Sequence, residues 1–188
     1  MSGTAALHLR REHGVAAAWG FAEATLFFLV PDVYLTRVAL RDGRLALAAA
    51  LAATAGAVLG GALMWAWGAA DPTAVLAVLD LVPAVSPAML ERVRGELLER
   101  GWLALALGPA RGTPYKLYAA VSGELGMALG GLLLVTVPAR LLRFAVLSLL
   151  ATGLRRGPLA RWTPAARRRL HLALWTAFYA AYLLLVEW

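Results

Sequence analysis

Long apolar runs, separated by short groups of polar and charged residues, make up most of this sequence. The clearest run, residues 45–70, contains 26 residues and no charged side chain. A helix needs about 20 apolar residues to cross a bilayer core about 30 Å thick. This run therefore predicts a spanning helix, and the similar runs at 130–154 and 170–188 predict two more. Pro138 is expected to kink the second of these.

Two other apolar segments are interrupted by proline. The first has an apolar arm at residues 14–30, about 25 Å long as a helix, which Pro31 and Asp32 then interrupt. The second is interrupted by Pro109 and Pro114. Broken backbone is tolerated at membrane depth only where protein buries it or where it lines a wet cavity. We therefore interpret each segment as a re-entrant hairpin, with two kinked packing helices as the alternative.

Residues 71–100 form a polar interval between these apolar parts. Ser86 followed by Pro87 is typical of a helix N-cap and first turn. The apolar residues that follow share one helical face: Leu90, Val93 and Leu97. The pattern predicts an amphipathic helix that lies on the membrane surface or against its neighbours.

The composition agrees with a membrane location. The chain is 61% hydrophobic and 15% charged, whereas a soluble domain is about 45–50% apolar and about 25% charged. There is no cysteine, which excludes disulfides, thiolate catalysis and cysteine metal sites. The three histidines, at 8, 13 and 171, have no ligand spacing. We therefore expect neither a metal nor another cofactor.

The positive charge is concentrated where a membrane topology would place it. Residues 155–169 contain six arginines and no acidic residue, and Arg10 and Arg11 lie near the N-terminus. The positive-inside rule explains the net charge of +7 without a nucleic-acid partner. We predict a cytoplasmic N-terminus, an external amphipathic helix and an external C-terminus.

The segments then fall into two similar halves of one membrane domain. Residues 14–70 and 101–156 each hold a broken hairpin and one full helix, in opposite orientations. Between them lies the external interval 71–100, and 170–188 closes the chain. The predicted fold is therefore an all-α integral membrane protein with two opposed re-entrant hairpins and about three spanning helices. This arrangement is typical of inverted-repeat transporters, whose broken segments mark the substrate site.

Charged residues within these apolar segments are the candidate site. They are Glu23, Asp32, Arg111, Lys116, Arg140 and Arg143. An unpaired charge at the bilayer centre costs at least about 2.5–3.5 kcal/mol, so we expect the carboxylates to face the cations, with Asp32 opposite Arg111. Arginine forks suit a phosphate, and such a carboxylate can exchange protons. A purely structural ion pair is the alternative for each charge.

Three motifs resemble the DedA family, also called the VTT or SNARE-associated-Golgi family, most of all its short bacterial branch. They are Glu23 with Pro31-Asp32, the stretch GPARGTPYKLYAAVSGELGM, and PARLLRF. The resemblance implies two opposed re-entrant hairpins, a bacterial inner-membrane location and transbilayer movement of lipids such as undecaprenyl phosphate. It also implies that Glu23 and Asp32 are the functional acids, and that Arg111 with Arg140 or Arg143 are the functional cations.

Together these patterns favour a membrane transporter of the lipid flippase or scramblase type. Coupling of lipid movement to protons is part of this hypothesis. A small-ion or oxyanion transporter is the main alternative, and a non-transporting scaffold is less favoured. We do not expect an enzyme. Ser122 and His171 resemble the residue pair of an intramembrane protease, but that motif requires glycine at position 120, where this chain has alanine. Membrane lipids are the expected partners. The Gly56–Gly60 face would serve internal packing or a homodimer.

Overall fold

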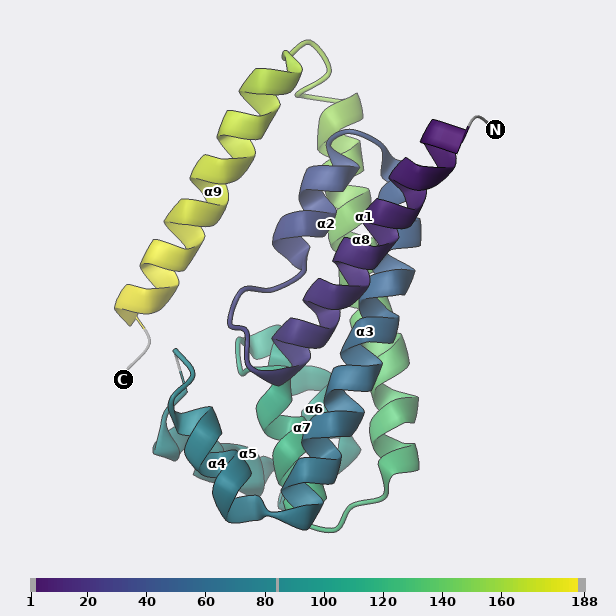
Figure 1. The fold of residues 1–188 in the computed structure, drawn as a ribbon. Coiled ribbons are helices and arrows are strands. Elements are labelled where there is room, and N and C mark those ends of the chain that lie inside the picture. The colour runs from purple at the N-terminus through teal and green to yellow at the C-terminus, as the bar shows by residue number, and fades with distance from the viewer. Residues whose placement is uncertain (1–2, 84, 186–188) are drawn as a thin grey trace.

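The computed structural model describes residues 3–83 and 85–185, and these ranges contain helices and no strand (Figure 1). The all-α class is thereby confirmed. In chain order the elements are α1 (Gly3–Thr25), α2 (Asp32–Ala39), α3 (Gly43–Ala70), α4 (Pro72–Asp80), α5 (Pro87–Arg100), α6 (Trp102–Leu107), the 3-10 helix η1 (Gly108–Arg111), α7 (Tyr115–Glu124), α8 (Leu129–Arg156) and α9 (Pro164–Leu185).

Two helical hairpins start from opposite ends of the molecule. In Figure 1, α1 descends from the upper end to the middle and α2 returns to the upper end. The second hairpin, α6 and α7, occupies the lower half, and its connection through η1 points toward the middle. The long helices α3 and α8 run from one end to the other, and α9 descends along one side. The breaks of both hairpins therefore lie near mid-height.

The first hairpin breaks earlier than the sequence predicts. The apolar arm was expected to span 14–30, but α1 begins at Gly3 and ends at Thr25. The hydroxyl of Thr25 donates to the carbonyls of Phe21 and Ala22, both at 3.0 Å. The chain then leaves the helix, and Pro31, which has no amide hydrogen to continue one, precedes α2. Asp32 is consequently the first residue of a helix.

The second hairpin breaks where its prolines predict. Helix α6 ends at Leu107 and η1 ends at Arg111. The next residue, Gly112, has a φ of 97°, in the left-handed region that glycine adopts easily. The amide of Thr113 donates to the carbonyl of Gly108 at 3.2 Å. Pro114 then precedes the first residue of α7. The turn thus reverses the chain within a few residues.

Helix α3 approaches both hairpins closely because it presents glycines to them. A Cβ atom on Gly56 would lie 1.9 Å from the carbonyl oxygen of Ala17 in α1. A Cβ atom on Gly68 would lie 2.0 Å from the carbonyl oxygen of Ala120 in α7. Gly60 also faces α1, with Ala24 in contact range. The Gly56–Gly60 face therefore serves internal packing.

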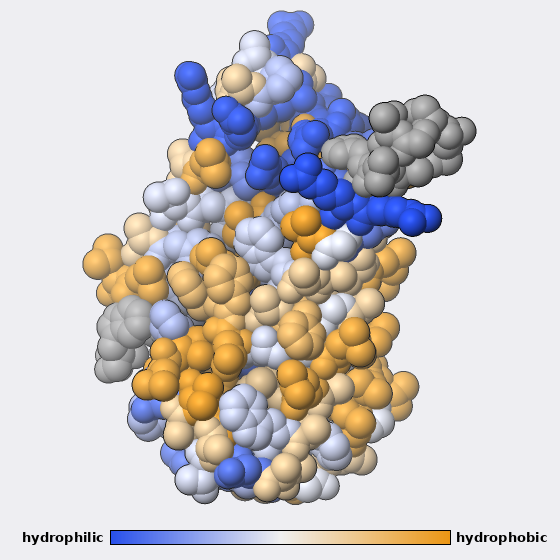
Figure 2. Space-filling view, in the orientation of Figure 1, coloured by the Kyte–Doolittle hydropathy of each residue, from blue (hydrophilic) through white to orange (hydrophobic). Residues whose placement is uncertain are grey.

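The outer surface carries many apolar side chains. Figure 2 shows a broad apolar region over the middle of the molecule and a hydrophilic upper end. Within the described ranges two helices, α3 and α8, are long and apolar enough to cross a membrane. Helix α9 was predicted as a third spanning helix from 170 to 188, but it begins at Pro164 and contains three consecutive arginines. It is not among the two, and residues 186–188 lie outside the described part.

Candidate functional site

The candidate site lies where the break of the first hairpin meets α7 and α8. Glu23 stands in the last turns of α1 and Asp32 begins α2. Arg140 and Arg143 lie in the middle of α8, three residues apart and hence on neighbouring positions of one face. Lys116 is in the first turn of α7. The structure thus brings together five of the six charged residues that the sequence singles out.

Glu23 and Arg140 form an almost completely buried ion pair. Nη2 of Arg140 lies 3.2 Å from Oε1 and 3.0 Å from Oε2 of Glu23. The guanidinium carbon also lies 4.2 Å from the ring centroid of Tyr115, a cation–π distance. The hydroxyl groups of Tyr115 and Thr136 are 2.8 Å apart. The pair therefore connects α1 to α8 and is backed by α7.

Asp32 and Arg143 form a second ion pair that is open on one side. Nη2 of Arg143 donates to Oδ2 of Asp32 at 2.6 Å. The Asp32 side chain is fully buried, whereas that of Arg143 is 30% exposed. Within the described part, Oδ1 of Asp32 has no hydrogen-bond partner. This pair thus combines a buried carboxylate oxygen that lacks a partner with a partly exposed guanidinium that a ligand can reach.

Lys116 joins the two hairpins directly. Its ammonium group donates to the carbonyl oxygen of Phe27 at 2.8 Å. Phe27 belongs to the break after α1, where helical partners for the backbone are missing. Buried carbonyl groups need a partner, and the lysine provides one. The predicted cation of the second hairpin therefore contacts the backbone of the first rather than one of its carboxylates.

Arg111 lies apart from this group. The prediction placed it opposite Asp32, but Asp32 pairs with Arg143 and the Arg111 side chain is exposed on η1. Arg111 is the last residue of η1, immediately before the left-handed Gly112. The turn directs the chain inward only after Pro114, so Lys116 is the buried cation of this hairpin. Arg111 instead lines an open hollow beside α5.

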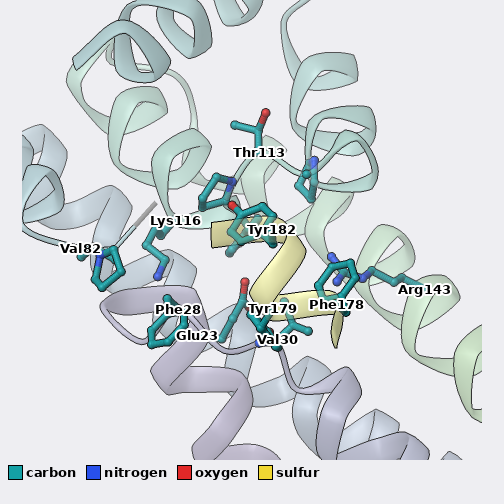
Figure 3. Close-up of a pocket in the computed structure, with 15 residues that line it drawn as sticks. Glu23, Phe28, Val30, Val82, Thr113, Lys116, Arg143, Phe178, Tyr179 and Tyr182 are labelled. Carbon is teal, nitrogen blue, oxygen red and sulfur yellow. Dashed lines mark hydrogen bonds between the residues drawn. The ribbon is translucent and has the colours of Figure 1, made fainter. Parts of the chain in front are cut away.

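A small cavity of about 100 Å³ lies between these elements (Figure 3). Three of the charged residues line it: Glu23, Lys116 and Arg143. The remaining lining is mainly proline and aromatic, and includes Phe28, Tyr115, Phe178, Tyr179 and Tyr182. One ordered water needs about 10–15 Å³ in such a cavity. The space is therefore sufficient for a few waters or one small polar group.

The aromatic residues of α9 belong to the site although sequence analysis did not select them. The hydroxyl of Tyr179 accepts a hydrogen bond from the amide of Val30 at 2.8 Å. Trp175, Phe178, Tyr179 and Tyr182 are spaced three, four and seven residues apart, which places them on one helical face. That spacing was the available signal. It predicts an aromatic face on the last helix, but not what the face covers.

The far end of the second hairpin is held by a surface ion pair. Arg94 of α5 donates to Glu124 of α7 at 2.6 Å and also bonds to Glu91. These two carboxylates raise the pKa of the Arg94 guanidinium above its ordinary value. The amphipathic helix α5, whose predicted face of Leu90, Val93 and Leu97 is buried, thereby lies against α7.

Comparison of the chain with protein-family models, curated proteins and solved structures finds no match. The resemblance to the DedA family therefore stays a prediction from its motifs.

Proposed function

We propose that this protein is an integral membrane transporter of the lipid flippase or scramblase type, which moves a phosphate-bearing lipid. The observation that carries the proposal is the pair of ion pairs, Glu23–Arg140 and Asp32–Arg143, at the break of the first hairpin. Charges at this depth are costly in a bilayer. An ionisable residue at membrane depth is by default a candidate for a substrate or proton pathway.

The apolar surface supports a membrane location. Exposed leucines lie along α3 and α8, the two helices with the length and composition to span a bilayer. They include Leu51, Leu59, Leu63, Leu134, Leu142 and Leu149. The arginines of the α8–α9 connection and of α2 lie at the hydrophilic end of Figure 2. By the positive-inside rule, this end faces the cytoplasm.

The packing of the hairpins supports an inverted repeat. Helix α1 packs on α3 and α2 packs on α8. In the second half, α6 packs on α8 and α7 packs on α3. Exchange of the two halves therefore reproduces the same set of contacts, with each hairpin bridging the two long helices. Opposed repeats of this kind can change access to a central site by moving against one another.

The chemistry of the second ion pair suits a phosphate and a proton. Arg143 is partly exposed to the cavity, and a guanidinium binds phosphate with two parallel hydrogen bonds. When Arg143 turns to a phosphate, the buried carboxylate of Asp32 loses its cation. A buried carboxylate without a cation favours the protonated form. Phosphate binding and proton uptake would thus be coupled at one residue pair.

The test is transbilayer movement of a fluorescent phosphate-bearing lipid in vesicles that contain the purified protein. We expect faster movement than in protein-free vesicles, and a large loss with Asp32→Asn. Glu99→Gln is the matched control, because Glu99 is an exposed carboxylate on α5. Equal rates with and without wild-type protein would reject the proposal.

A small-anion transporter is the second candidate, and the size of the cavity is the observation in its favour. A space of about 100 Å³ holds an inorganic oxyanion but not a lipid head group with its chains. Uptake of inorganic phosphate into the same vesicles, without movement of the fluorescent lipid, would favour this candidate. A non-transporting scaffold is less favoured, because it needs no buried charges between its helices.

A further inference from the structure

A second, larger groove runs along the molecule between α2, α8 and α9. Its volume is about 560 Å³, within the range of about 300–1,000 Å³ that is common for ligand sites. Its walls are almost entirely apolar, and include Leu147, Leu150 and Leu154 of α8 and Leu170, Leu174 and Phe178 of α9. The inner end is formed by Asp32 and Arg143. The groove therefore leads from the outer surface to the second ion pair.

The outer end of the groove opens into a basic hollow of about 450 Å³. Leu40, Arg167 and His171 line both spaces, so the two adjoin one another. The hollow is also lined by Arg37, Arg41 and Arg168, and no acidic side chain is among its lining residues. An apolar channel with a basic mouth matches a molecule that has an anionic head and an apolar tail.

Two of the arginines in the hollow are available for a ligand. Arg167 is occupied, because it donates to the carbonyls of Leu159 and Ala160 at 3.1 and 3.0 Å. Arg41 lies 3.9 Å from a carboxylate oxygen of Glu12. Arg37 and Arg168 form no ion pair within the part of the chain that the structure describes, and both are at least partly exposed.

We propose that the groove and the hollow together bind one membrane lipid with a phosphate head group. The phosphate lies between Arg37 and Arg168, and an acyl or prenyl chain lies between α8 and α9. The site is the cytoplasmic entry for the transported lipid, a role that rests on the proposed function. The inner contacts agree with this role, since Val30, Arg143 and Phe178 line both the groove and the central cavity.

Charge complementarity favours a lipid over the other possible occupants. An apolar helix of a second copy would fill the groove but leave the arginines of the hollow without an anion, and the chain carries a net charge of +7. Free phosphate would satisfy the arginines but leave the apolar walls uncovered. A phosphate-bearing lipid satisfies both surfaces at once.

Within the part of the chain that the structure describes, a few polar contacts connect the wall formed by α9 to the first hairpin, which would allow a lipid chain to enter. His171 Nε2 lies 3.0 Å from the hydroxyl of Thr36, and the indole of Trp175 donates to the same hydroxyl at 3.2 Å. The third contact is the hydrogen bond between Val30 and Tyr179. These contacts connect α9 to the first hairpin along the length of the groove.

The site can be tested by native mass spectrometry of the purified full-length protein with two lipids of equal acyl chains. Phosphatidic acid is the anionic probe and diacylglycerol is the neutral one. We expect the double variant R37Q/R168Q to lose binding of phosphatidic acid by about tenfold or more, with no change for diacylglycerol. The control R156Q/R161Q removes two exposed arginines that do not line the hollow, and should bind as wild type.

The apolar part of the site has its own variant and control. Leu174→Trp fills the groove and should lower the binding of both lipids. Leu172→Trp changes an exposed leucine on another face of α9 and should lower neither. Gel filtration and helical content measured by circular dichroism establish that each variant is folded.

Three results would overturn the site: undiminished binding of phosphatidic acid by R37Q/R168Q, an equal loss in R156Q/R161Q, or full displacement of the lipid by inorganic phosphate. Failure of the proposed function looks different. If vesicles show no lipid movement while binding keeps this dependence on head group and groove, the transport proposal fails and the lipid site stands. If movement occurs and R37Q/R168Q binds normally, the site fails and the transport proposal stands.

Discussion

Arg140 and Glu23 are 117 positions apart in the sequence, yet they form an ion pair with side chains only 3% and 6% exposed. Because Glu23 lies close to the end of α1, the pair holds the tip of the first hairpin against the middle of α8. The ring of Tyr115 covers the other side of the guanidinium. One arginine thus connects three helices that come from both halves of the chain.

We expect Glu23→Gln and Arg140→Met to destabilise the protein strongly when made singly, because each leaves an uncompensated buried charge. Loss of one partner of a buried ion pair costs about 3–5 kcal/mol. The double variant removes both charges and should be less destabilised than the sum of the singles. Thermal unfolding in detergent, followed by tryptophan fluorescence, measures this. Additive losses would show that the two side chains do not stabilise each other.

Arg143 should differ from Arg140 in what its loss affects. Arg143 is 30% exposed and lines the central cavity, whereas Arg140 is 3% exposed and lies outside its lining. We expect Arg143→Gln to lower lipid movement by about ten- to a hundredfold, and also to lower thermal stability, because the buried carboxylate of Asp32 loses its cation. Arg140→Gln should lower thermal stability more than Arg143→Gln does. A variant Arg143→Lys keeps the charge but loses the fork, and should restore lipid movement only in part.

If Arg140→Gln and Arg143→Gln changed stability and lipid movement in the same proportion, the distinction between a structural and a ligand-binding arginine would be wrong.

The apolar pattern predicts the long helices well, because they depend on local composition. The run 45–70 corresponds to α3 and the run 130–154 to α8, each within two residues at both ends. The end of α1 was predicted less well, since it depends on distant residues. Lys116 donates a hydrogen bond to the carbonyl of Phe27, 89 positions away, and the indole of Trp19 donates one to the carbonyl of Leu29. No local pattern contains those contacts.

The candidate site was predictable as a set of residues but not as a set of pairs. Glu23, Asp32, Arg140 and Arg143 can be selected from the sequence because a charge in an apolar membrane segment carries a high free-energy cost. Which carboxylate meets which cation depends on how α8 lies against α1 and α2, and the sequence contains no measure of that register. The expectation of Arg111 opposite Asp32 failed for this reason.

The close contact of α1 with α3 predicts opposite effects for two glycine substitutions. In Gly56→Ala the new Cβ would lie 1.9 Å from a backbone oxygen of α1, so the helices must separate. Overpacking of this kind costs about 1–3 kcal/mol or more. Gly153→Ala is the control, because a Cβ there meets nothing within 4 Å. In a helix it should stabilise by about 1 kcal/mol.

The thermal midpoints of these two variants, measured side by side, decide the matter. Equal or higher stability of Gly56→Ala would contradict the packing of α1 against α3.

Arg111→Ala should leave lipid movement within about twofold of wild type, as is usual for exposed positions away from a site. Arg111 is exposed on η1 and belongs to neither ion pair. Lys116→Ala serves as the comparison on the same hairpin, because Lys116 is buried and bonds to Phe27. We expect Lys116→Ala to lower both stability and lipid movement. A large loss with Arg111→Ala alone would return the functional cation to the position that the sequence motif implies.

The absence of cysteine makes the predicted orientation directly measurable, since single cysteines can be introduced without removing any. Two variants are suited to this test, Arg161→Cys and Glu99→Cys. Arg161 lies in the connection between α8 and α9 and Glu99 lies on α5, and both native side chains are exposed. In intact cells an impermeant maleimide should label position 99 and leave position 161 unlabelled. After the membrane is permeabilised, position 161 should react as well. Labelling of both positions in intact cells would place the arginine-rich end and α5 on the same side. That result would contradict both the crossing of the membrane by α8, the candidate spanning helix between the two positions, and the proposed cytoplasmic entry site between Arg37 and Arg168.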